Sequence, residues 1–198
     1  MKRLLLASSL WVAGLAMAAS VSVQVNDGSG KPLADAVVFL ESAAAKAAAR
    51  PAAGAEIAQA GKQFAPSVTV VPVGSSVHFP NRDTVRHHVY SFSPAKTFEL
   101  KLYTGTPANP VLFDKAGVVV LGCNIHDHMI AWVLVVETPY YGKTNDQGML
   151  TLNNVAAGAY RLRSWHSAMA PGSTPQSLAV TVAATDASVG VVLKGVSP

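Results

Sequence analysis

The sequence contains little cysteine and little charge. One Cys occurs among 198 residues, and Asp, Glu, Lys and Arg together make up 13% of them. A single Cys excludes an internal disulfide. No cluster of Lys and Arg, alone or interleaved with aromatic residues, marks a nucleic-acid surface. The sequence therefore predicts neither a disulfide scaffold nor a nucleic-acid-binding protein.

The motifs of common enzymes are missing as well. The sequence has no Gly-x-Ser-x-Gly, no Gly-rich loop that would cradle a phosphate, and no pair of carboxylates in a plausible cleft setting. We therefore predict that the protein is not an enzyme and has no catalytic residues.

The first residues have the layout of a secretory signal. Lys2 and Arg3 precede an apolar run that ends in small residues. Residues 1–18 are predicted as a signal peptide cleaved after Ala18, and a cut after Ala19 fits nearly as well. The run is too short for a membrane span, and no later stretch reaches the roughly 20 apolar residues that a span needs. The sequence thus predicts an exported, periplasmic protein, whose net charge of +4 falls to +2 when Lys2 and Arg3 leave with the signal.

Most of the remaining sequence alternates apolar and polar residues with period two, interrupted by Gly, Pro, Asn and Asp. This pattern is typical of short strands in an all-β sandwich. The Ala-rich segment 42–61 differs and is predicted as an exposed insert, helix-prone up to Arg50 and broken by Pro51 and Gly54. The predicted segments after the signal are an N-terminal β segment at 20–41, the Ala-rich insert at 42–61, a central β domain at 56–137 and a C-terminal β domain at 138–198.

The only Cys lies in a segment rich in sulfur and imidazole. In GCNIHDHM, residues 122–129, Cys123, His126 and Met129 have the spacing Cys-x2-His-x2-Met, between two apolar strands. Soft sulfur ligands combined with imidazole select copper, and one Cys with two His and a weak axial Met is an electron-transfer arrangement. A free thiol in an oxidising compartment is a liability unless something such as a metal occupies it. The segment therefore predicts a copper site that needs one more His.

The segment NRDTVRHHV supplies the missing imidazole. His87 and His88 begin a predicted strand at 87–93, about 36 residues upstream of Cys123. A second segment far along the chain thus offers the donor that the loop lacks.

Together, PNRDTVRHHVYSF and GCNIHDHM resemble the cupredoxins, the small blue copper proteins such as plastocyanin and amicyanin. The similar stretch covers roughly residues 56–137, and the ligand loop has the amicyanin length. The resemblance implies a Greek-key cupredoxin sandwich with one copper ion that cycles between Cu(II) and Cu(I). Carried over by position, it implies four metal ligands: His87, Cys123, His126 and Met129.

One departure from the family leaves the first ligand open. Cupredoxins commonly have Asn after the first His, whereas this chain has His88, which could itself be the ligand. Strand alternation favours His87, because we expect Val89 and Phe92 to lie in the core while the two His face opposite sides.

A second departure is an additional imidazole inside the loop. His128 could replace His126 only in a longer Cys-x4-His loop, and Met129 would then be its neighbour and poorly placed to lie axial. We therefore prefer His126 and expect His128 at the surface near the copper edge. The pair His126-x-His128 is too little for a multicopper oxidase, which needs several His-x-His pairs, and one Cys excludes a two-Cys binuclear centre.

The flanks resemble a second kind of β domain. VQVNDGSGKPLADAVVFLE and TNDQGMLTLNNVAAGAYRLRSW are similar to the opening and closing strands of a prealbumin-like, carboxypeptidase-regulatory-type sandwich. This resemblance implies an additional small β-sandwich formed by the flanking segments, with the copper module inserted between residues 42 and 138. An extended cupredoxin with a C-terminal accessory domain is the alternative.

The cupredoxin resemblance implies one-electron transfer by a mononuclear type 1 copper in the periplasm. The redox partner implied is a cytochrome c or a periplasmic dehydrogenase, such as that for methylamine. Two other hypotheses stay open: a carrier or storage protein that binds Cu(I) at the same site, and a metal-free adhesive sandwich. The nearly neutral surface does not favour an acidic or a basic partner.

Overall fold

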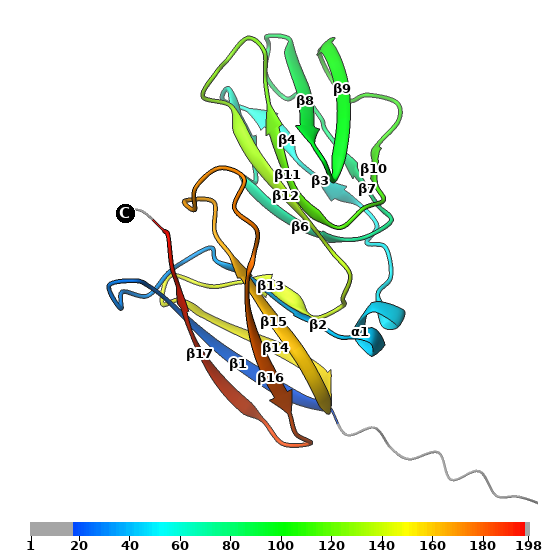
Figure 1. Cartoon of the computed structure of the whole chain (residues 1–198). Coiled ribbons are helices and arrows are strands. Elements are labelled where there is room, and N and C mark those ends of the chain that lie inside the picture. Colours follow the sequence, from blue (N-terminus) through cyan, green and yellow to red (C-terminus); the bar gives the residue numbers. More distant parts are fainter. Residues whose placement is uncertain (1–17, 197–198) are drawn as a thin grey trace, which may run out of the picture.

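The structure is a computed structural model that describes residues 18–196. The chain is nearly all β and folds into two sandwiches, one above the other in Figure 1. Within the described part of the chain, no helix is both long and apolar enough to cross a bilayer. The predicted signal peptide lies outside the described residues, apart from Ala18 at its end.

The lower sandwich in Figure 1 is built from both ends of the chain. Its strands are β1 (Ala18–Asp27), β2 (Val37–Glu41), β13 (Tyr141–Lys143), β14 (Met149–Ala156), β15 (Gly158–Trp165), β16 (Gln176–Val182) and β17 (Ala187–Leu193). They form two sheets with the strand orders β14-β1-β17 and β13-β2-β15-β16. Alternate residues of β1, such as Val21 and Val23, pack with Leu40 of β2 and Leu162 of β15 in one hydrophobic core. The flanking segments therefore form the additional small sandwich that the sequence predicted.

The upper sandwich comes from the middle of the chain. Its strands are β3 (Ala55–Glu56), β4 (Ala58–Ala60), β5 (Gln63–Ala65), β6 (Val68–Pro72), β7 (Ser75–His78), β8 (His87–Ser93), β9 (Lys96–Tyr103), β10 (Val111–Phe113), β11 (Gly117–Gly122) and β12 (Ile130–Val136). A five-stranded sheet, β6-β12-β11-β8-β9, shares its core with a three-stranded sheet, β10-β7-β3, and β4 and β5 form a separate hairpin. The loop between β11 and β12 lies at the end of this sandwich away from the lower one (Figure 1).

Strands β2 and β12 are buried on both faces. In β2, Val38 and Leu40 point into the lower core, whereas Val37 and Phe39 join a third cluster between the sandwiches. That cluster contains Val37, Phe39, Val68, Leu134, Val136 and Trp165. A strand covered on both faces needs an unbroken apolar run, which explains VVFL in β2 and AWVLVV in β12.

The Ala-rich segment is less exposed than the sequence predicted. Ser42 caps a short helix, α1 (Ala43–Ala48), by accepting the Ala45 backbone N–H at 3.0 Å. The second half of the segment enters β3 and β4, and Ile57 between them is fully buried in the upper core. The prediction of an exposed insert is therefore wrong for residues 57–59, which are buried, whereas Glu56 and Ala60 on either side are exposed. Burial of the large apolar side chain of Ile57 holds this part against the core.

Candidate metal centre

His87 is the first residue of β8, where the strand is irregular. The register with β9 shifts between His87 and Val89, so the two His are not a regular alternating pair. Both are buried, with 0% of His87 and 4% of His88 exposed. The prediction for Phe92 is wrong, since it is 78% exposed. Phe92 lies three residues after the buried Val89, and residues an odd number apart face opposite sides of a strand.

The loop after β11 buries both of its ends. Cys123 is 3% exposed and Met129 is fully buried, and both belong to the core cluster of the upper sandwich. The Met129 N–H donates to the His126 carbonyl at 2.9 Å, which closes a tight turn. His126, in the middle, is half-buried. The two ends of this short loop, Cys123 and Met129, are therefore buried in the core, whereas His126 in its middle lies nearer the surface.

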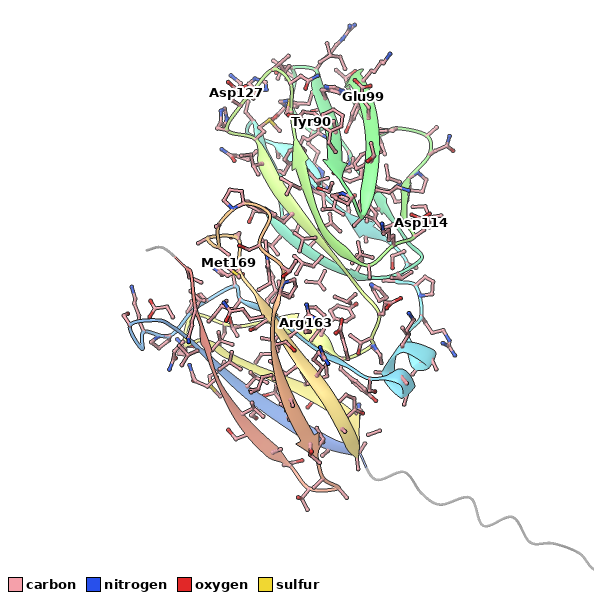
Figure 2. The ribbon with its side chains drawn as sticks, viewed as in Figure 1. Tyr90, Glu99, Asp114, Asp127, Arg163 and Met169 are labelled. Atoms are coloured by element: carbon pink, nitrogen blue, oxygen red, sulfur yellow. The ribbon has the colours of Figure 1, made fainter. Side chains whose placement is uncertain are left out.

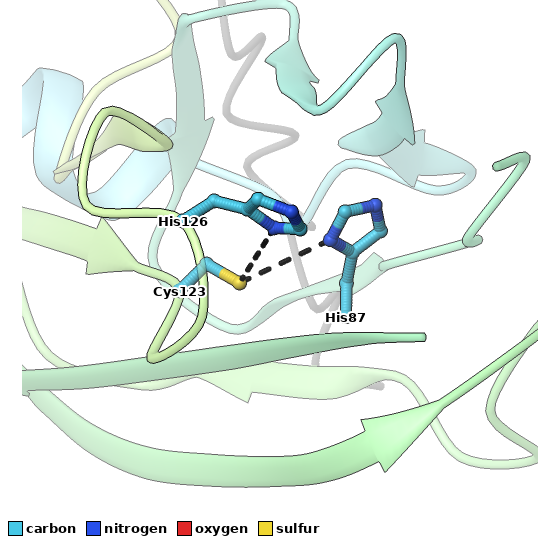
Figure 3. A group of neighbouring side chains, drawn as sticks. All are labelled: His87, Cys123 and His126. Atoms are coloured by element: carbon cyan, nitrogen blue, oxygen red, sulfur yellow. Dashed lines mark hydrogen bonds between the residues drawn. The ribbon is translucent and has the colours of Figure 1, made fainter. Parts of the chain in front are cut away.

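Three of the four predicted ligands come together around one point. The Nδ1 atoms of His87 and His126 each lie 3.9 Å from the Cys123 Sγ (Figure 3). All three donor atoms lie within 4.8 Å of one another. Metal–nitrogen and metal–sulfur bonds of about 2.0–2.3 Å at trigonal angles would separate the donors by about 3.7 Å. The observed spacing therefore fits three donors around a single ion.

Asp83 sets the tautomer of His87. Its Oδ2 lies 2.8 Å from His87 Nε2, and an ionised carboxylate only accepts hydrogen bonds, so Nε2 carries a proton, and the neutral form of the ring has its lone pair on Nδ1. Asp83 also accepts the backbone N–H of Lys62 at 2.9 Å and of Gly61 at 2.7 Å. The Lys62 N–H and the His87 ring together hold the pKa of Asp83 below its ordinary value. A lone pair directed at Cys123 is what metal ligation requires.

The turn of the β4–β5 hairpin ties the two ligand segments together. Its Gly61 and Lys62 donate to Asp83 beside His87, as described above, and the Lys62 carbonyl accepts from His128 Nε2 at 3.1 Å. His128 is exposed and is not one of the three clustered donors. Sequence reasoning missed both Asp83 and this hairpin, although the position of Asp83 four residues before His87 is a signal that could have found the carboxylate.

His88 points to other neighbours. Its Nε2 lies 3.0 Å from Glu99 Oε1, and its ring packs beside Tyr90 with centroids 5.6 Å apart. It is absent from the donor cluster of the described residues. Of the two adjacent imidazoles, the structure therefore brings His87 and not His88 to Cys123.

The Tyr90 ring packs against Gly122, next to the Cys123 thiol. A Cβ added to Gly122 would lie 2.8 Å from the Tyr90 ring, closer than real Cβ atoms approach, so the residue before Cys123 must be Gly for Tyr90 to pack there. Cys123, Met129 and Tyr90 line the same surface depression. The fourth predicted ligand, Met129, thus shares the immediate surroundings of Cys123.

The electrostatics around His126 favour its neutral form. Removal from water lowers the pKa of His126 below its ordinary value, and the neighbouring His87 and Lys62 add to this effect. A neutral imidazole retains the lone pair that a metal binds. Two imidazoles and one thiol, two of the three buried, form a donor set of the type that copper prefers.

The fold and this donor set together define an all-β protein with a candidate centre for one soft metal ion. No protein-family model matches the chain, and no curated protein matches it. Solved structures do resemble it. A reduced variant of amicyanin is 21% identical over 50% of this chain and 98% of its own, with a TM-score of 0.39.

Two further solved structures resemble this chain with similar identities and TM-scores. A purple cupredoxin from Nitrosopumilus maritimus is 22% identical over 42% of this chain and all of its own, with a TM-score of 0.37. A copper-containing nitrite reductase from Thermus scotoductus is 23% identical over 46% of this chain, with a TM-score of 0.39. The chain spans about a quarter (26%) of that reductase. The upper sandwich, with its five- and three-stranded sheets, spans most of residues 56–137, the stretch for which the sequence resemblance implied a cupredoxin fold.

Asn81 is expected to be needed for the His87 loop. Its Nδ2 donates to the carbonyls of Val85 and Tyr103, each at 2.8 Å, and its Oδ1 accepts the Asp83 N–H at 3.0 Å. Asn81→Ala removes all three bonds and is expected to cost about 2–3 kcal/mol of folding stability. It should also weaken metal binding by about tenfold, because the loop no longer fixes Asp83 and His87. Chemical denaturation and competition with a chelator measure the two effects.

Asn145 provides a matched control in the lower sandwich. Its Oδ1 accepts the N–H groups of Gln147 at 3.0 Å and Met149 at 2.9 Å in a comparable turn. Asn145→Ala should destabilise the protein without changing metal affinity. Equal losses of metal affinity in both variants would contradict a specific role for Asn81.

Proposed function

We propose that this protein transfers single electrons through one copper ion that His87, Cys123 and His126 would hold, with Met129 as the fourth ligand. One observation carries the proposal: three soft or borderline donor atoms, one from the start of β8 and two from the loop after β11, meet within 4.8 Å. Copper supplies a one-electron couple between Cu(II) and Cu(I) when bound to such a set. No bond to a substrate is made or broken, so the proposal includes no catalytic residue.

The chain contributes a fixed set of donors. His87 begins β8 and Cys123 directly follows β11, two neighbouring strands of one sheet, and their burial leaves little room for either side chain to move. Asp83 holds the proton on His87 Nε2, so the ligating nitrogen stays free. Donors that stay in place in both oxidation states keep the reorganisation on electron transfer small. This rigidity is the protein's part in the function.

The electron would pass through the edge of His126. His126 is the only one of the three clustered donors that is not buried, and the exposed Ile125 lies beside it in the loop. A partner protein that docks on this end of the upper sandwich reaches the site without crossing the fold. We propose a cytochrome c or a periplasmic dehydrogenase as that partner.

A carrier of Cu(I) is the second candidate function. A carrier needs a site that opens for exchange, whereas Cys123 and His87 are 3% and 0% exposed. Cyclic voltammetry on the copper-loaded protein separates the two functions. Electron transfer requires one reversible wave and retention of the metal after reduction. Loss of the reduced metal to a Cu(I) chelator within the time of the scan would favour the carrier.

We also propose that the chain is exported to the periplasm and that its central module, residues 56–137, is inserted in an outer β domain. The proposed cleavage after Ala18 would remove only the first residue of β1. Strands on both sides of the central module share one core, which supports an inserted arrangement. The mass of the protein recovered from the periplasm of an expressing cell tests the cleavage site.

Asp83→Asn is expected to weaken copper binding and raise the reduction potential. The amide is neutral and no longer enforces the Nε2–H tautomer of His87, and outer ligand contacts of this kind are worth about 10–100-fold in metal affinity. Removal of a negative charge disfavours Cu(II) relative to Cu(I), so the potential becomes more positive. Chelator competition and voltammetry provide the two measurements.

Asp114 is the matched control for this prediction. Its carboxylate lies 3.3 Å from the Lys96 ammonium, its pKa is also lowered, and it belongs to neither ligand segment. Asp114→Asn should leave affinity and potential unchanged. If both variants shift the potential equally, the effect is one of net charge and the role of Asp83 is refuted.

A further inference from the structure

A cleft lies between the two sandwiches, separate from the proposed copper site. It has a volume of about 700 Å³. The outer face of the upper sheet forms one wall, with Val120, Ile130 and Trp132, and the end of β15 and the following turn form the other. Figure 2 shows Arg163 and Met169, which belong to the second wall, on the side of the lower sandwich that faces the upper one. The cleft exists only because both sandwiches are present.

The lining is apolar and partly aromatic. Trp132 and Trp165 pack with ring centroids 6.2 Å apart, and Val120 and Ile130 remain 41% and 44% exposed. Pockets for small ligands typically have volumes of about 300–1,000 Å³ and are lined mainly by such side chains. The size and the exposed apolar surface therefore suit one small apolar molecule.

The charge of the lining has one sign. Lys115 and Arg163 are the only charged residues among those that line the cleft, and both are positive. Lys115 donates to the Pro94 carbonyl at 3.2 Å. A ligand with a single negative charge therefore matches this surface better than a neutral or cationic one.

The Arg163 guanidinium also has N–H groups that make no hydrogen bond within the described residues. One Nη2–H donates to the Pro175 carbonyl at 2.9 Å, and Nη1 lies 3.6 Å from Glu41 Oε2. Its Nε is buried and makes no hydrogen bond within residues 18–196. The buried Nε is closed to a ligand, but the guanidinium has four Nη N–H groups, and only one of them donates a hydrogen bond within residues 18–196. The other Nη N–H groups can donate to the carboxylate of a bound ligand.

We propose that the cleft binds a small apolar carboxylate, with its apolar body against Trp132 and Met169 and its carboxylate at Arg163. The site is independent of the copper function and would exist in the metal-free protein. The carboxylate could belong to a flat aromatic acid or to a short fatty acid, and both share the required chemistry.

Isothermal titration calorimetry on the metal-free, exported protein tests the proposal. The probes are 2-naphthoate, decanoate and the neutral analogue 2-naphthylmethanol. We expect at least one carboxylate to bind with a dissociation constant below about 1 mM, a reasonable value for a ligand of this size. Binding of 2-naphthoate alone indicates an aromatic acid, and binding of decanoate alone indicates a fatty acid. Failure of both carboxylates to bind, or equal affinity for 2-naphthylmethanol and 2-naphthoate, overturns the proposal.

Substitutions locate the site. Arg163→Met should weaken carboxylate binding by about tenfold, the value of one charge-assisted hydrogen bond, and leave 2-naphthylmethanol within about twofold. Arg161→Met is the matched control, since Arg161 lies on the same face of β15 but does not line the cleft. Ala170→Phe, at an exposed lining position, should block all probes even if Arg163→Met fails to fold. Unchanged binding in Ala170→Phe would place the ligand elsewhere and contradict the proposal.

Discussion

Replacement of Cys123 by Ser is expected to abolish the colour and the reversible redox behaviour of the copper-loaded protein. The intense visible absorption of such a site comes from charge transfer between a thiolate and Cu(II), and an alcohol oxygen offers neither the energy match nor the soft donor. The fold should survive, because Ser is nearly isosteric, although a buried hydroxyl costs about 1–3 kcal/mol of stability. Visible absorption and voltammetry after copper loading are the measurements.

Ser91→Ala is a suitable control for Cys123→Ser. Ser91 is fully buried on the neighbouring strand β8, and its Oγ accepts the Ser93 N–H at 3.1 Å. Loss of this hydroxyl should cost about 1 kcal/mol of stability without any change in the absorption band. If the Cys123→Ser protein kept the absorption band, Cys123 would not be a copper ligand.

The second large effect is expected for His87→Ala, which should strongly reduce copper affinity, whereas His88→Ala should not. His87 Nδ1 lies 3.9 Å from the Cys123 thiol, so its loss removes a direct donor and should reduce copper affinity by more than the roughly 100-fold found for outer contacts. His88→Ala removes a residue that contacts Glu99 instead and should change the affinity by less than about threefold. Competition with a chelator measures both.

The comparison of the two His variants is internally matched, since both side chains are buried at adjacent positions of β8. Both substitutions should destabilise the fold to a similar degree. If His88→Ala lost copper while His87→Ala retained it, His88 would be the ligand and the assignment from the resemblance would be wrong.

Local patterns predicted the strands well. Period-two alternation indicated the strand 87–93, and β8 spans His87–Ser93. What it could not indicate was which sheet a strand joins, because pairing depends on residues far away in the sequence. The parallel pairing of β1 with β17, from opposite ends of the described chain, has no local signal. The flanking resemblance, and not the alternation, suggested that the two ends meet.

In the candidate site, too, the residues with a local sequence signal could be predicted, and the contacts between distant segments could not. Cys123, His126 and Met129 could be predicted because all three lie in one short loop whose spacing is visible in the sequence. The choice between His87 and His88 could not be derived from alternation alone, since the register shift in β8 breaks the regular pattern. The contacts of Asp83 could not be predicted from the sequence, because its partners include backbone N–H groups of the β4–β5 turn. Every residue except Pro has such a group, so the sequence does not mark which ones bind.

The visible absorption spectrum of the unmodified protein after loading with Cu(II) is the most direct test of the proposed centre. If His87, Cys123 and His126 hold one copper ion, the protein takes up one equivalent and shows an intense charge-transfer band, which disappears on reduction and returns on reoxidation. A correctly folded, oxidised preparation that takes up no stoichiometric copper or stays colourless with copper bound would contradict the account.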